Sequence, residues 1–140
     1  MAARGLRNNN PGNVRIGSDW NGLADRANMT DEQLAETEMC VFAHPAYGIR
    51  VIVYLLLKYQ SNYGLDTLYE IISRYAPSVE NDTNAYADYV SQKAGVDPHA
   101  NIDISVPETL RAVVMAIIKH ENGSNPYTYE IDDGIALGLK

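Results

Sequence analysis

The chain has 140 residues, of which 46% are hydrophobic and 21% charged, and this length and composition suit one globular domain over residues 1–140. Its formal net charge of −7 argues against a nucleic-acid partner, which requires clustered lysine and arginine, and against adsorption to anionic membranes. The lone Cys40 excludes a disulfide within the chain, and the longest apolar run, residues 51–57, is too short for membrane insertion.

The first part of the chain is predicted to contain little regular structure. Residues 8–13 read NNNPGN, a run of turn-forming residues that favours loop and turn over residues 6–24. Residues 38–42 are apolar enough to form a strand. We expect that strand to pair with residues 14–16 in a small β-hairpin.

A short helix is predicted to begin at Asp31. Thr30 and Gln33 have the spacing of a capping box, in which each side chain bonds the other residue's backbone N–H. Three acids follow in the same segment, and we expect them to form a solvated face: Glu32, Glu36 and Glu38.

Four longer helices are predicted from the spacing of apolar residues: 47–59, 67–75, 83–94 and 107–121. The first is apolar nearly all round, which is typical of a buried central helix. Capping residues mark the starts of the other three: Thr67, Asp82 and Ser105. The fold is therefore predicted to be mainly α, with a small β element near the N-terminus.

The last of these helices ends on an acid, Glu121, which Asn122 and Gly123 follow. The exposed carbonyl groups at the C-terminal end of a helix carry a partial negative charge, which disfavours a carboxylate there. The position favours the protonated form that a general acid needs. Glu121 also follows Ile117 and Ile118 at helical spacing, so we expect it to lie on the buried stripe and to point inward, more buried than the three acids above.

Other kinds of active site lack their motifs in this chain. The sequence contains neither a serine or cysteine nucleophile motif nor a glycine-rich phosphate loop. The three histidines, His44, His99 and His120, lack the spacing of metal ligands. We therefore expect no metal and no cofactor, and acid catalysis on a sugar remains.

The C-terminal segment reads IIKHENGSNPYTYEIDDGIALGL, a helix ending in a glutamate that runs into Asn-Pro and then Gly-Ile-Ala-Leu-Gly-Leu, close to the Gly-Ala-x-Gly-Leu of the enzymes named next. This arrangement resembles the catalytic segment of lytic transglycosylases and goose-type lysozymes, where the final motif is a turn. In those enzymes the segment lies near the start of the domain, so the resemblance implies a circular permutation. The rest of the chain contains RGLRNNNPGNVRIGSDWNGLA, FAHPAYGIR and RYAPSVENDTNAYADYV. These segments resemble phage and prophage proteins of the virion-associated lysozyme or transglycosylase type.

The resemblance implies a lysozyme-like helical fold that cleaves peptidoglycan glycan strands between N-acetylmuramic acid and N-acetylglucosamine, with Glu121 as general acid and base. It implies that further residues bind substrate: Tyr75, Glu80, Asn81, Tyr86, Asn125, Tyr127, Asn10 and Asn13. For the asparagines of the NNNPGN turn the alternative is hydrogen bonding within the turn, and for Glu80 it is a structural role before a helix. Ala76 departs from the pattern, because the enzymes carry an asparagine after the cleft-lining tyrosine.

Within this reading, a lytic transglycosylase is favoured over a hydrolase. The substrate's own 6-hydroxyl attacks in a transglycosylase, so one acid suffices, whereas a hydrolase needs a second carboxylate roughly 5–9.5 Å away. Two alternatives remain: a non-catalytic virion structural protein with a lysozyme-like fold, and a phage protein that binds a host protein through its acidic surface. The N-terminus lacks the apolar core of a signal peptide. We therefore expect the protein in the phage virion, beside other virion proteins, or in the host cytoplasm, with delivery to the periplasm and cell wall.

Overall fold

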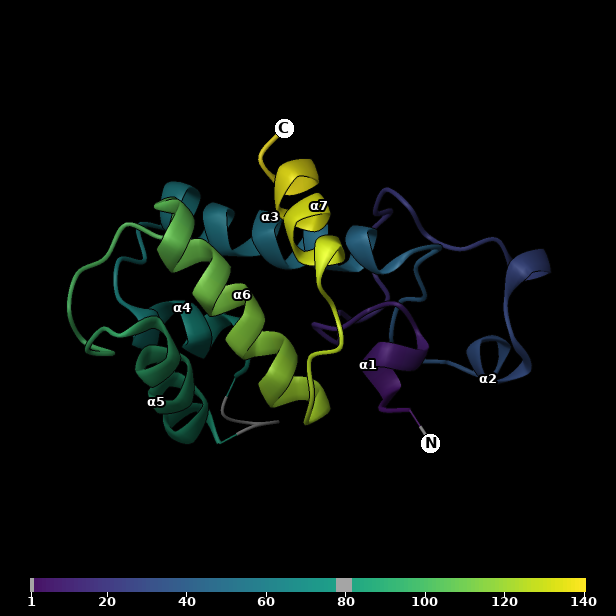
Figure 1. The fold of residues 1–140 in the computed structure, drawn as a ribbon, viewed down its shortest axis with the longest axis horizontal. Coiled ribbons are helices and arrows are strands. Elements are labelled where there is room, and N and C mark those ends of the chain that lie inside the picture. The colour runs from purple at the N-terminus through teal and green to yellow at the C-terminus, as the bar shows by residue number, and fades with distance from the viewer. Residues whose placement is uncertain (1, 78–81) are drawn as a thin grey trace.

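The computed structural model describes residues 2–77 and 82–140, and in this part the chain is mainly helical, as the sequence predicts (Figure 1). The helices that it describes are α1 (Arg4–Arg7), the 3-10 helix η1 (Arg26–Asn28), α2 (Asp31–Leu34), α3 (Pro45–Tyr63), α4 (Leu68–Tyr75), α5 (Thr83–Ala94), α6 (Pro107–Asn122) and α7 (Tyr129–Gly138). None of these helices combines the length and the hydropathy needed to cross a bilayer.

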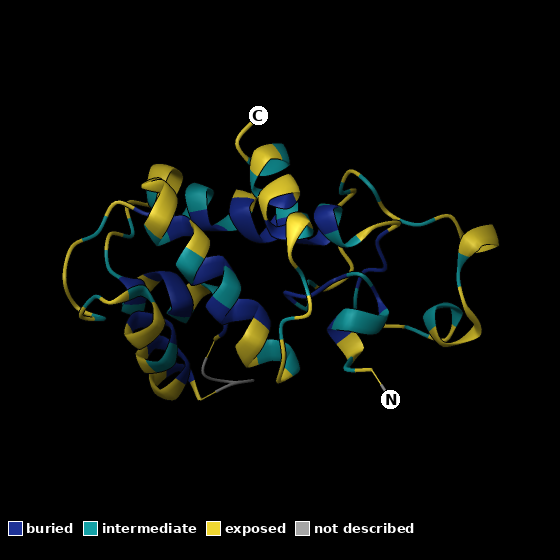
Figure 2. Cartoon of the chain, viewed as in Figure 1, coloured by how far each residue is buried: buried dark blue, intermediate teal, exposed yellow. Residues whose placement is uncertain are grey.

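Helix α3 begins and ends on residues suited to those positions. The His44 ring accepts a hydrogen bond at Nδ1 from the backbone N–H of Ala46 at 3.1 Å, and Pro45 occupies the first turn, where a helix needs no N–H. Gly64 ends the helix with a φ of 66°, a left-handed conformation that glycine adopts without steric cost. The first half of α3 is largely buried, as its apolar composition predicts (Figure 2).

Helix α7 packs along α3, and residues 134–138, where the family resemblance implied a turn, are instead helical. The contact depends on two glycines. A Cβ atom on Gly134 would overlap the side chain of Ile49, and one on Gly138 would lie 2.6 Å from Cβ of Val53. Each glycine lowers the intrinsic stability of a helix by about 1 kcal/mol relative to alanine. The contact with α3 therefore stabilises α7 against the low helix propensity of its glycines.

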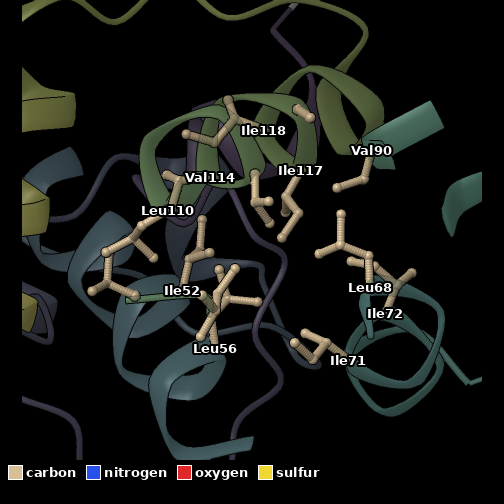
Figure 3. Close-up of a cluster of buried hydrophobic side chains, with 14 of the residues drawn as sticks. Ile52, Leu56, Leu68, Ile71, Ile72, Val90, Leu110, Val114, Ile117 and Ile118 are labelled. Carbon is tan, nitrogen blue, oxygen red and sulfur yellow. The ribbon is translucent and has the colours of Figure 1, made fainter. Parts of the chain in front are cut away.

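The main hydrophobic core lies between α3, α4, α5 and α6 (Figure 3), and α7 covers α3 (Figure 1). Figure 3 shows its side chains meeting: Ile52, Leu56, Leu68, Ile71, Ile72, Val90, Leu110, Val114, Ile117 and Ile118. Each of these is at most 1% exposed, and burying one such side chain contributes roughly 1.5–3 kcal/mol. The buried stripe of α6 ends at Ile117 and Ile118, one turn before Glu121. Glu121 therefore lies on the side of the helix that faces the interior.

The capping predictions are confirmed for α2, α4 and α5 but not for α6, and at α4 the Thr67 side chain accepts the N–H of Glu70. Thr30 and Gln33 form the predicted capping box, and the Asp82 side chain accepts the N–H of Ala85 at 3.1 Å. Helix α6 instead begins after Val106 without a side-chain cap, and the Ser105 side chain donates to Asp103. Pro107 occupies the first turn of α6, where its missing N–H leaves one fewer donor for a cap to satisfy.

The segments before α3 pack against that helix in a smaller core around Cys40, Phe42 and Val51. The predicted pairing is present, because the N–H of Cys40 donates to the carbonyl of Val14 at 2.9 Å and an antiparallel bridge joins Arg15 to Met39. The pairing consists of isolated bridges, and no strand or hairpin forms in the part of the chain that the structure describes. A long connection that includes α2 separates the two segments, so no tight turn extends the ladder.

Glu36 corrects the expectation of a solvated acidic face. Its side chain is 1% exposed and accepts hydrogen bonds from Arg4 at 2.9 and 2.6 Å, from Arg7 at 3.0 Å and from Asn8 at 2.9 Å. These donors, first of all Arg4, hold the pKa of Glu36 well below its usual range. Glu36 therefore anchors α1 to the segment after α2, whereas the neighbouring acids are exposed as predicted.

Candidate active site

Glu121 lies in the last turn of α6, whose C-terminal cap is Gly123 with a φ of 78°. Both oxygens of its half-buried carboxyl group accept a hydrogen bond. Oε1 accepts from Nδ2 of Asn13 at 2.9 Å, and Oε2 accepts from the hydroxyl of Tyr86 at 2.8 Å. The donors come from the N-terminal turn and from α5, so the tertiary structure holds the carboxyl group in one orientation at the edge of the core.

The NPGN turn, residues 10–13, is attached to the helices by side chains from α4 and α6. Nδ2 of Asn122 donates to the carbonyl of Pro11 at 2.8 Å, and the Tyr75 hydroxyl donates to the carbonyl of Gly12 at 2.8 Å. The next residue of the turn makes the bond to the carboxyl group described above. Three successive residues of the turn are thus fixed against the end of α6, which positions the amide donor for that carboxyl group.

Asn10 holds this turn together from inside and does not line a cleft. Its Oδ1 accepts the N–H of Val14 at 3.0 Å, and its Nδ2 donates to the carbonyl groups of Val14 and Cys40 at 2.9 and 3.0 Å. Asn10 is 0% exposed, so the prediction that it binds substrate is wrong and the alternative of bonding within the turn holds. Asn13 completes the turn with a φ of 52°, which asparagine tolerates better than most residues.

Tyr75 and Tyr86 have pKa values raised above the usual range for tyrosine. Burial is the main cause in both, and the negative charge of Glu121 adds to it. Both hydroxyls therefore stay protonated and act as donors. Tyr86 is 0% exposed and stacks on His120 with ring centroids 3.8 Å apart. It was predicted to bind substrate, but its burial leaves it to orient Glu121.

A cleft of about 360 Å³ lies beside the NPGN turn. Its lining residues are Gly12, Asn13, Val14, Arg15, Leu55, Tyr59, Tyr75 and Pro77. Two predicted site residues, Asn13 and Tyr75, therefore share this cleft. Glu121 is not one of its lining residues and is linked to it by the hydrogen bond from Asn13. The lining combines two tyrosines with polar and aliphatic side chains, the mixture of apolar surface and a few polar groups that small-molecule sites have.

The remaining predicted residues lie elsewhere or cannot be placed. Asn125 accepts the N–H of Tyr127 at its own Oδ1 at 3.1 Å and lines a different groove, between α5 and α6. Tyr127 packs against the main core, and burial raises its pKa to about 12. Neither is part of the cleft at Asn13. Glu80 and Asn81 lie outside the residues that the structure describes.

Gly48 and Tyr59, which were not identified from the sequence, shape the site but carry no group proposed to react. Gly48 lies within α3, and a Cβ atom there would overlap the carbonyl of Asn9, so only glycine lets the N-terminal turn approach the helix. A glycine inside an apolar helix is a signal for such an approach. Tyr59 lines the cleft, and the Arg74 guanidinium lies 5.5 Å from its ring centroid. No pattern of spacing in the sequence indicates that Tyr59 and Arg74 lie near Asn13.

Within residues 2–77 and 82–140 no group of three histidine, cysteine, aspartate or glutamate side chains is arranged to hold a metal ion. At the described site, the carboxyl group of Glu121 is held by an asparagine amide and a tyrosine hydroxyl, and a carboxyl group is one of the side-chain groups that can transfer protons.

No known protein-family model matches the chain. Over 139 residues, 99% of its length, the chain is 42% identical to Protein P5 of Pseudoalteromonas phage PM2, and the match covers 83% of that protein. The chain belongs to the Protein P5 family. It is therefore related to a phage protein along nearly its whole length. Both the NPGN turn and the end of α6 lie within the aligned region.

Proposed function

We propose that this member of the Protein P5 family cleaves the peptidoglycan glycan strand between N-acetylmuramic acid and N-acetylglucosamine, with Glu121 as the general acid and base. The observation that supports this most is the fixed orientation of the Glu121 carboxyl group by Asn13 and Tyr86, next to the cleft that Asn13 and Tyr75 line. Orientation of a single acid beside a binding cleft is what general acid catalysis requires.

In the proposed reaction Glu121 donates its proton to the glycosidic oxygen as the bond from that oxygen to the muramic acid C1 breaks. The 6-hydroxyl of the same muramic acid then attacks C1 and gives its proton to Glu121, which restores the acid and leaves an anhydro sugar. Tyr86 and Asn13 keep the carboxyl group in place through both proton transfers. A hydrolase would use water in place of the 6-hydroxyl and a second carboxylate, for which Glu80 is the sequence candidate.

Peptidoglycan strands are the substrate in this proposal, and we propose two routes by which a phage protein would reach them. The protein acts either from the virion, beside other virion proteins, or from the host cytoplasm once lysis gives access to the periplasm and cell wall. In both cases the anionic polymer that the cleft binds is peptidoglycan and not a nucleic acid.

The test is to measure muropeptide release from purified peptidoglycan by wild type, Glu121→Gln and the control Glu108→Gln. Glu108 lies exposed at the opposite end of the same helix. Glu121→Gln keeps the size of the side chain and removes its proton, so we expect a loss of at least about 10²-fold with an unchanged circular dichroism spectrum. The control should keep wild-type activity. Equal activity of all three proteins would overturn the proposal.

The products decide between the two reaction types. A transglycosylase releases anhydro muropeptides, which lack one water relative to the products of a hydrolase and are separated from them by mass spectrometry. Glu80→Gln should leave the anhydro products unchanged if one acid suffices, and should abolish reducing products if Glu80 is the second carboxylate.

One observation favours a second candidate, a non-catalytic phage protein that keeps the helical fold. Both oxygens of Glu121 already have partners within the chain, and the bond to Asn13 joins the N-terminal turn to α6. In that case Glu121 stabilises the fold. Purified wild-type protein would then release no muropeptides, while Glu121→Gln would lower the unfolding temperature.

A further inference from the structure

A second groove, also of about 360 Å³, lies between α5 and α6 and shares no lining residue with the cleft at Asn13. It is lined by Tyr89, Lys93, Ala112, Met115, Ala116, Lys119 and Asn125. The four residues from α6 follow one another at helical spacing along one stripe, and the two from α5 are four residues apart. The groove therefore runs along both helices, with two alanines and a methionine in its floor.

The charge at this groove is opposite to that of the chain. The protein has a formal net charge of −7, yet two of its four lysines, Lys93 and Lys119, border the groove, and the lining residues include no acid. Among the described residues neither lysine takes part in an ion pair. Lys93 instead lies over the Tyr89 ring, with Nζ 5.7 Å from the ring centroid. Charge complementarity of this kind selects anionic partners.

The floor of the groove favours a peptide over a rigid small molecule. Ala112 and Ala116 let another chain approach the backbone of α6, and Met115 is a flexible side chain that adapts to irregular partners. A volume of about 360 Å³ is near the lower limit of small-molecule sites, roughly 300–1,000 Å³, and holds one or two apolar side chains. Apolar grooves between two helices are a common way to bind an amphipathic segment.

We propose that the α5–α6 groove binds an acidic amphipathic segment of another protein. The segment places an apolar side chain over Ala112 and Ala116 and its carboxylates against Lys93 and Lys119. The Asn125 amide borders the same groove and can donate to a backbone carbonyl of the bound segment. This inference does not depend on glycan cleavage, because the groove and the cleft at Asn13 share no residue.

The four lysines of the chain provide a matched test. The probe is a short fluorescent peptide of alternating glutamate and leucine pairs, and its affinity is measured by fluorescence anisotropy with the full chain. The groove variant carries Lys93→Glu and Lys119→Glu, and the control carries Lys58→Glu and Lys140→Glu, which change the net charge equally. Lys58 also lies 5.7 Å from a tyrosine ring centroid, so both variants remove one such contact.

We expect the groove variant to weaken binding by about tenfold or more and the control by less than about threefold. Ala112→Phe fills the groove without changing charge and should weaken binding as well. A peptide in which serine replaces leucine should bind weakly to all variants. Equal loss of affinity in the groove variant and the control, or full affinity in Ala112→Phe, would overturn the proposal.

The same variants distinguish another protein from a second copy of this chain as the occupant. Sedimentation velocity of the full chain should show one species at all concentrations for wild type and variants. A wild-type dimer that the groove variant dissociates and the control retains would assign the groove to self-association and contradict the proposal.

Discussion

The hydroxyl of Tyr86, a side chain that is 0% exposed, donates a 2.8 Å hydrogen bond to Oε2 of Glu121. A buried hydroxyl without a partner costs about 1–3 kcal/mol, so the bond ties the packing of α5 to the direction of this carboxyl group. The second oxygen is held by Asn13 from the other end of the chain.

Asn13→Asp should destabilise the protein at neutral pH. The substitution replaces the amide donor 2.9 Å from Oε1 of Glu121 by a second carboxylate, so a hydrogen bond becomes a repulsion between like charges. We expect a loss of about 2 kcal/mol in the free energy of unfolding at pH 7, measured by urea titration. Stability relative to wild type should recover as the pH falls toward 4, because one proton relieves the repulsion. Asn13→Gly keeps the left-handed backbone and loses only the bond, so its deficit should not recover at acid pH.

Tyr86→Phe and Tyr127→Phe should make the protein less sensitive to alkaline pH. An unfolded tyrosine loses its proton near pH 10, whereas burial raises the pKa of Tyr127 to about 12 and that of Tyr86 further. The stability that these groups contribute is therefore intact below about pH 10 and is lost as the pH rises beyond it. Unfolding temperatures measured between pH 8 and 12 should fall less steeply in each variant. A wild-type curve that stays flat up to pH 12 would contradict the raised pKa values.

Glu36→Gln should destabilise the protein far more than Glu38→Gln. Glu36 is 1% exposed on its side chain and accepts from Arg4, Arg7 and Asn8, whereas the Glu38 side chain is 55% exposed. We expect losses of about 2 kcal/mol and less than about 1 kcal/mol, respectively, in urea unfolding at pH 7.

The contribution of Glu36 should also depend on pH. Its pKa is lowered in the fold, so its stabilisation is present above the ordinary carboxyl value near 4.3 and is lost as the pH falls below it. The difference between wild type and Glu36→Gln should therefore shrink under acid conditions. A constant difference between pH 7 and pH 2 would show that the charge of Glu36 is not what stabilises this region.

Gly48→Ala should weaken both the fold and the site. A Cβ atom on Gly48 would overlap the carbonyl of Asn9, and moving that segment also moves the NPGN turn that holds Asn13 against Glu121. We expect a loss of about 1–3 kcal/mol in unfolding free energy and reduced muropeptide release. Gly64→Ala is the control, because a Cβ atom there meets open space and only its left-handed φ of 66° is disfavoured. Equal activity of the two variants would separate the turn from catalysis.

Local sequence patterns determined most of the helices. The caps at Thr67 and Asp82 and the end at Gly95 lie where the structure has them, because helix propensity and capping act over a few residues. The helix predicted over residues 47–59 lies within α3, which extends over Pro45–Tyr63. Helix α7 escaped this reasoning. Its glycines argue against a helix locally, and only contact with α3 over Gly134 and Gly138 makes the helix stable.

For the site, the sequence by itself determined the position of Glu121 at the end of a helix whose buried stripe points inward. Tertiary structure decided the rest. Asn10 and Asn13 lie three residues apart in the same turn, yet one is buried among backbone groups and the other bonds Glu121 across 108 positions of sequence. Likewise Glu36 is buried against Arg4 and Arg7, whereas Glu38, two residues later, stays exposed beside Arg4 and Arg15. Hydrogen bonds and ion pairs depend on distance in the folded chain, and spacing in the sequence carries no information on which distant groups will meet.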